Sequence, residues 1–175
     1  MLCPTWVRGA VEGDADGLVK LRVDTIRDAY AGTMPVEFMD PVSEHERASQ
    51  LRAAIRSGAR TWLIAVAGHE LVGACALGPA RDSDMPADSG EISMIAVVSP
   101  HRRHGHGFML LNAARSVALA RAWRDLVLWV VAGHAEARAF YARAGFTADG
   151  SERVDDSLGF AAPIVRYRMP IVAVH

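Results

Sequence analysis

Residues 99–108 bring together residue types that bind anions. This stretch, "SPHRRHGHGF", contains two arginines, three histidines and two glycines, between an apolar β-branched run and an Ala/Leu-rich helical run. Glycine lets a ligand approach the backbone closely. The first turn of a helix offers N–H groups without intrahelical acceptors and carries a positive partial charge. The stretch therefore predicts a phosphate or pyrophosphate site at a helix start, with arginine as an added donor.

Three other interpretations of this loop are weaker. A metal site would need His101, His104 and His106 to converge, and no carboxylate or cysteine lies nearby to complete the ligand set. A nucleic-acid site would rest on one short basic run without interleaved aromatics, in a chain of net charge −1. A glycine turn that only caps a helix stays open as an alternative. Neither a Gly-Lys-Ser/Thr sequence nor a third glycine at residue 110 is present, so the two common nucleotide fingerprints are excluded.

Size and composition indicate one globular domain over residues 1–175. The 175 residues are 51% hydrophobic, which is typical of a chain with its own core. The two cysteines, Cys3 and Cys75, predict neither a zinc site nor a disulfide framework. We see no secretory leader and no apolar run long enough for a membrane span. The sequence predicts a cytoplasmic protein with no metal and with neither nucleic acid nor membrane as a partner.

The elements that must position the loop can be read from hydrophobic periodicity and helix-capping signals. The loop should follow a strand at 91–98 and open a helix at 107–121. The other strands are expected at 5–10, 61–67, 71–78 and 126–131, with two more after residue 145 around a polar loop. The other helices are expected at 14–30, capped by Asp14, at 43–58, opened by a Ser43/Glu46 capping box, and at 134–144, stopped by Gly145. This order predicts an α/β fold with a mixed sheet and at least one parallel strand pair.

Three segments together resemble a known family. Arg102-x-x-Gly105-x-Gly107 matches the Arg/Gln-x-x-Gly-x-Gly/Ala signature of the GCN5-related N-acetyltransferases, the GNAT superfamily. The preceding "GEISMIAV" resembles the fourth strand of that family, and "AFYARAGF" resembles its Phe-Tyr segment near the last helix. The order of elements over nearly the whole chain is also similar. The resemblance implies a central, mostly antiparallel mixed sheet of about seven strands, four flanking helices, and fourth and fifth strands that splay apart.

The resemblance also implies acetyl-CoA as cosubstrate. The pantetheine arm is expected to pair with the backbone of Ile95, Ala96 and Val97. The pyrophosphate is expected on the loop and the helix start, where the implied residues are Arg102, Arg103, His104, Gly105, His106, Gly107 and Phe108. His134 stands where the family often has an asparagine that contacts the pantetheine arm. Phe140 and Tyr141 are expected near the thioester, with Phe140 also packing the last helix onto the sheet.

Two residues are implied as catalytic. Glu91 matches a position where many family members carry a general base for the attacking amine. Tyr141 matches the tyrosine that protonates or hydrogen-bonds the departing thiolate. The resemblance thus predicts an N-acetyltransferase in which the amine attacks the thioester directly in a ternary complex. The alternatives are a non-catalytic acyl-CoA-binding module, a protein or peptide N-acetyltransferase, and a different acyl donor.

The acceptor is expected to be a small-molecule primary amine, and a homodimer is compatible with the resemblance. Tyr30, Met34 and Glu37, together with Glu91, are the predicted acceptor-binding residues. Two loops are acidic, at 81–90 and 150–160, and one interpretation is that they attract a cationic acceptor. The other is that their carboxylates are merely solvated. The acidic residues are Asp82, Asp84, Asp88, Asp155 and Asp156.

Overall fold

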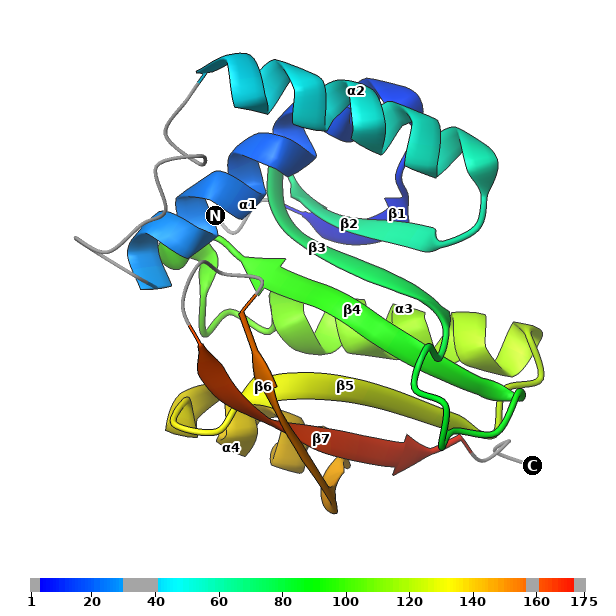
Figure 1. Cartoon of the computed structure of the whole chain (residues 1–175). Helices are drawn as coiled ribbons and strands as arrows, with labels where there is room; N and C mark the ends of the chain where they lie inside the picture. Colours follow the sequence, from blue (N-terminus) through cyan, green and yellow to red (C-terminus); the bar gives the residue numbers. More distant parts are fainter. Residues whose placement is uncertain (1–3, 30–40, 157–160, 172–175) are drawn as a thin grey trace. The chain divides into compact units, whose positions relative to one another are not determined.

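The structure is a computed structural model that describes residues 4–29, 41–156 and 161–171. Its strands follow the order β1-β2-β3-β4-β5-β7-β6 in a seven-stranded sheet (Figure 1). The chain divides into two compact units, which we describe separately. The first unit comprises residues 1–77 and 94–114, and the second comprises residues 78–93 and 115–175. A single domain over 1–175 stays a prediction.

The first unit has an antiparallel meander covered by two helices. β1 (Thr5–Gly9) pairs with β2 (Thr61–Ala67), and β2 pairs with β3 (Glu70–Pro79). Between β1 and β2 the chain forms α1 (Ala15–Ala29) and α2 (Pro41–Ser57). These two helices lie side by side (Figure 1). Leu18 and Leu21 of α1 pack against Ile64 of β2 and Ala74 of β3 in a fully buried core. This apolar stripe at helical spacing is what orders α1 on the sheet.

The second unit contains the predicted parallel pair. β4 (Ser89–Val97) pairs in parallel with β5 (Asp125–Val131), from Ser89 opposite Asp125 to Ile92 opposite Leu128. α3 (His106–Ala120) connects these two strands. β7 (Ala162–Pro170) pairs antiparallel with both β5 and β6 (Thr147–Asp155), and α4 (Ala135–Arg143) precedes β6. The mixed α/β fold with seven strands and four helices is confirmed.

Three local predictions need correction. α2 begins at Pro41 rather than at Ser43, because proline suits the first helical position, so Ser43 lies inside the helix. Asp14 does not begin α1; it closes a short 3-10 turn by accepting the Val11 N–H at 2.8 Å. The acidic stretch expected as a loop from residue 150 is strand through Asp155, and Gly150 turns within it at φ 91°.

Gly90 lies in β4 where no side chain fits. A Cβ at Gly90 would lie 2.1 Å from Cε3 of Trp123, a ring that is buried. We expect Gly90→Ala to lower the free energy of unfolding by about 3 kcal/mol, because the ring would have to leave its packed position. Denaturant melts of the variant and the parent measure this loss.

Gly9→Ala is the matched control for this substitution. Gly9 is also a strand glycine, and a Cβ there meets nothing within 4 Å. The alanine should be neutral or slightly stabilising because it reduces the freedom of the unfolded chain. Equal midpoints for the two variants would show that Trp123 does not restrict residue 90.

Candidate active site

The predicted anion loop lies between β4 and α3 in the first unit. After Val97 the chain makes a 3-10 turn at Ser99–His101 and passes through left-handed conformations at Arg103 (φ 66°) and Gly105 (φ 86°). α3 then begins at His106, and its first hydrogen bond runs from Met109 N–H to the Gly105 carbonyl at 3.0 Å. A Cβ at Gly105 would meet nothing within 4 Å, so the loop has open space on that side. An open glycine turn before a helix start suits a phosphate group.

His106 adds a buried polar atom to this loop. The residue is 7% exposed, and its Nδ1 has no hydrogen-bond partner within the described part of the chain. The ring centroids of His101 and His104 lie 5.9 Å and 6.2 Å from that of His106. Burial lowers the pKa of His106, and the charges of His101 and His104 lower it further. A buried ring nitrogen without a partner is rare in folded proteins.

The Arg102 side chain contacts both β4 and α1. Its Nε donates to the Val97 carbonyl at 3.0 Å, and its Nη2 lies 3.9 Å from Asp28 of α1. Ile95, Ala96 and Val97 form the half-buried end of β4 directly before the loop. The predicted pantetheine strand and the predicted pyrophosphate loop therefore belong to the same unit and are joined through Arg102.

Glu91 lies on β4 in the second unit and is 3% exposed. Its carboxylate accepts three hydrogen bonds from Arg81, which come from the backbone N–H at 3.2 Å, Nε at 3.0 Å and Nη2 at 2.5 Å. The hydrogen bonds to Glu91 raise the pKa of Arg81. These three hydrogen bonds hold the Glu91 carboxylate in one orientation. Sequence reasoning missed Arg81, because nine residues of loop and strand separate it from Glu91.

Tyr141 lies in an aromatic cluster of the second unit. It is 9% exposed, and its ring lies 5.2 Å from Phe140, 6.0 Å from Phe146 and 6.5 Å from Tyr167. Phe140 is only half-buried. The more buried of the two aromatic rings is thus the tyrosine, whose hydroxyl carries the predicted chemistry.

His134 caps α4. Its Nδ1 accepts the Ala137 N–H at 3.3 Å, which satisfies one of the N–H groups at the helix start. A histidine where the family often has asparagine therefore has a structural role in this chain. Its contact with a pantetheine arm stays a prediction.

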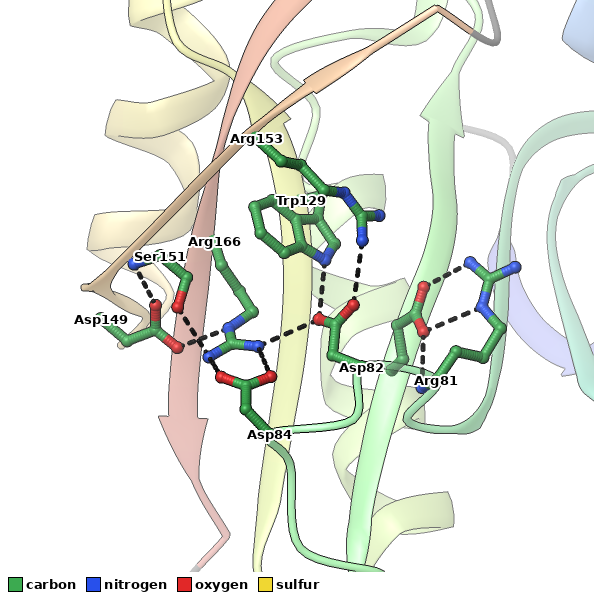
Figure 2. Close-up of polar contacts among 9 residues, drawn as sticks. Arg81, Asp82, Asp84, Trp129, Asp149, Ser151, Arg153 and Arg166 are labelled. Carbon is green, nitrogen blue, oxygen red and sulfur yellow. Dashed lines mark hydrogen bonds and ion pairs between the residues drawn. The ribbon is translucent and has the colours of Figure 1, made fainter.

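The loop from residue 80 to residue 88 is fixed by a buried arginine of β7 (Figure 2). Arg166 is 5% exposed, and all five of its N–H donors are bound by Asp82, Asp84, Asp149 and Ser151 at 2.6–3.0 Å. Asp82 also accepts from Trp129 Nε1 and Arg153 Nη1, each at 3.0 Å. Asp88 pairs with Arg124. Each of the three loop aspartates is paired with an arginine, but only the Asp82 side chain is mostly buried, and the side chains of Asp84 and Asp88 are exposed. The pairing weakens the basis for a cationic acceptor bound by this loop.

The predicted site residues divide between the two units. The first unit holds Ile95–Val97 and the loop at 102–108, and the second holds Glu91, His134, Phe140 and Tyr141. Tyr30, Met34 and Glu37, the predicted acceptor-binding residues, lie outside the described residues. Within the described ranges no group of three or more His, Cys, Asp or Glu could hold a metal ion. Across the same ranges no helix is both long enough and apolar enough to cross a membrane.

Comparison with known proteins identifies the family. The model of the acetyltransferase (GNAT) family matches residues 23–146, which include the loop, Glu91 and Tyr141. The chain therefore belongs to the GNAT acetyltransferase family, and it is an acyltransferase.

Solved structures share its fold. PaiA N-acetyltransferase from Thermoplasma acidophilum, in complex with coenzyme A, is 18% identical with a TM-score of 0.71, over 95% of this chain and 99% of that chain. Ribosomal-protein-alanine N-acetyltransferase from Brucella melitensis is 24% identical with a TM-score of 0.73, over 94% and 98%. The putative acetyltransferase yncA from Salmonella typhimurium, with acetyl-CoA, is 15% identical with a TM-score of 0.74, over 98% and 96%.

Proposed function

We propose that this protein transfers the acetyl group of acetyl-CoA to the primary amine of a small-molecule acceptor. The observation that carries the proposal is the loop before α3. Gly105 at φ 86° leaves open space directly before the start of α3, whose first turn offers N–H groups without intrahelical acceptors. Such a site binds negatively charged phosphate oxygens best, because they accept hydrogen bonds from the N–H groups of the first turn.

The residues present fit coenzyme A in this arrangement. The loop from Arg102 to Phe108 would hold the pyrophosphate, and the backbone of Ile95–Val97 would align the pantetheine arm. When bound, acetyl-CoA supplies an activated acyl thioester. Two structures of the same fold were determined with coenzyme A or acetyl-CoA, which supports this assignment.

The chemical roles fall to residues of the second unit and to β4. Glu91 accepts the proton that the attacking amine loses, directly or through water. Arg81 holds the Glu91 carboxylate in one orientation through its three hydrogen bonds and is therefore a positioning residue. The Tyr141 hydroxyl donates a hydrogen bond or proton to the leaving sulfur, and a backbone N–H near Ile95 stabilises negative charge on the carbonyl oxygen.

The test of this function is release of free thiol from acetyl-CoA in the presence of a panel of amines. We expect Tyr141→Phe to lower kcat about 100-fold with little change in acetyl-CoA affinity, because the hydroxyl acts only on the leaving group. Unchanged kcat would remove Tyr141 from this role.

Tyr167→Phe is the matched control for the hydroxyl. Tyr167 belongs to the same aromatic cluster, and its Oη accepts from Arg138 Nε at 3.2 Å. Loss of the Tyr167 hydroxyl should leave kcat within about twofold of the parent value. Tight CoA binding without turnover of any amine would instead indicate a non-catalytic binding module. Including a peptide and other acyl-CoA donors in the panel separates the remaining alternatives.

A further inference from the structure

Adjacent residues hold the segment between β3 and β4 from two sides, as Figure 2 shows. Arg81 points to β4, where its backbone N–H and its guanidinium donate to Glu91. Asp82 points the other way, and its carboxylate accepts hydrogen bonds from side chains of β5, β6 and β7. All of these residues belong to the second unit. The contacts of Asp82 and the contacts of Glu91 therefore act on the same short stretch of backbone.

Three donors fix the Asp82 carboxylate. Trp129 Nε1 and Arg166 Nη1 donate to one oxygen and Arg153 Nη1 donates to the other, each at 3.0 Å. The Asp82 side chain is only 12% exposed. The Arg153 guanidinium also lies over the Trp129 ring, with its Cζ 4.1 Å from the ring centroid. Because charged donors bind both oxygens, the carboxylate has one orientation and its backbone is anchored.

The backbone next to Asp82 depends on this anchor. Ala80 N–H donates to the Ser89 carbonyl at 2.9 Å, so the start of the segment is fixed by a backbone hydrogen bond. The next N–H, that of Arg81, donates instead to a side chain, the Glu91 carboxylate, at 3.2 Å. The placement of Arg81 on Glu91 thus lies between one backbone hydrogen bond and the anchored carboxylate of Asp82.

We propose that Asp82 is a positioning residue for acetyl transfer. Anchored by β5, β6 and β7, Asp82 fixes Arg81 so that the Glu91 carboxylate is held in one orientation toward the attacking amine. The proposal rests on the function proposed above, in which Glu91 accepts the proton of that amine. Misplacement of a reacting group by about 1 Å can lower a rate by about 100-fold, even when the altered residue is remote from the chemistry.

Asp82→Asn tests the proposal, because the amide keeps the size of the side chain but places an N–H group among donors. We expect kcat to fall about tenfold, with acetyl-CoA affinity within about twofold of the parent value. In a Glu91→Gln background, where the carboxylate to be positioned is absent, the same substitution should change kcat by less than about twofold. Thiol-release kinetics and titration with CoA measure these quantities. Unchanged kcat, or equal losses in the two backgrounds, would overturn the inference.

Asp125→Asn is the matched control. Asp125 also binds an arginine of β7, accepting from Arg168 Nη2 at 2.6 Å, and its side chain is 11% exposed. This variant should also lose stability, but its kcat should stay within about twofold of the parent value. A tenfold fall in both variants would mean that loss of any buried carboxylate lowers the rate, and the positioning role of Asp82 would be refuted.

Two further measurements decide the question if Asp82→Asn does not fold. Trp129→Phe removes one donor of Asp82 and should lower kcat about threefold, and an unchanged kcat would contradict the proposal. Hydrogen exchange followed by NMR needs no turnover. In Trp129→Phe or Asp82→Asn the Arg81 N–H should exchange at least about threefold faster than in the parent, and the Ala80 N–H should change less. Unchanged exchange at Arg81 would overturn the inference alone, whereas a parent without turnover would refute the proposed function on which it rests.

Discussion

Replacing Gly105 with glutamate is expected to weaken CoA binding at least about 100-fold while the chain stays folded. The new carboxylate would stand where phosphate oxygens are expected, at the positive end of α3, so that like charges oppose each other in the loop. The φ of 86° adds conformational strain, but a Cβ has open space, so the fold itself should tolerate the change. Calorimetric titration with CoA, alongside a thermal melt, gives both quantities.

Gly150→Glu provides the control for charge and strain. Gly150 has φ 91°, and a Cβ there also meets nothing within 4 Å, but it lies in β6 of the second unit. This variant should bind CoA as the parent does. If Gly105→Glu retained parental CoA affinity, the assignment of the pyrophosphate to this loop would be wrong.

Replacing Arg166 with methionine is expected to lower the free energy of unfolding by about 3–5 kcal/mol at pH 7. Methionine preserves the stem of the side chain but leaves Asp82 and Asp149, with side chains 12% and 14% exposed, without their central cation. Arg153→Met is the comparison, because Arg153 is half-exposed and binds one oxygen of Asp82. Its loss should cost about 1 kcal/mol. Similar melts for the two variants would contradict a structural role for the buried arginine.

The same network predicts that the free energy of unfolding decreases as the pH falls into the acid range. The hydrogen bond from Arg166 lowers the pKa of Asp84. Burial would raise the pKa of Asp149, but hydrogen bonds from Ser151 N–H and Arg166 outweigh it and lower the pKa. Because these folded-state pKa values lie below the unfolded ones, the stabilisation is complete at neutral pH and is lost as the pH falls below about 4. Denaturant melts across this range should show a shallower acid decline for Arg166→Met than for the parent.

Local sequence signals predicted the strands and helices that carry the site. β2 was expected at 61–67 and spans Thr61–Ala67, because its β-branched run has no helical alternative. Gly145 was expected to stop α4 and has φ 95°, the left-handed conformation that glycine adopts without strain. The place of the loop between β4 and α3 was predicted in the same way, from glycines between a strand and a helix, and its binding of an anion stays a prediction.

Partners that are distant along the chain could not be predicted. Asp82 and Asp84 were seen as loop carboxylates, but their arginine lies more than eighty residues later on β7, and no spacing rule connects them. Nothing in the sequence singled out Arg81, whose guanidinium donates to the Glu91 carboxylate in the folded chain.

The large sequence separation between Arg166 and the aspartates that it binds has a consequence for synthesis. Asp82 and Asp84 leave the ribosome long before the residue that binds them, and contacts of such large sequence separation form late. Until β7 is made, these aspartates have no buried cation, and the segment between β3 and β4 cannot adopt its final conformation. A nascent chain that stops before Arg166 should therefore lack this loop structure.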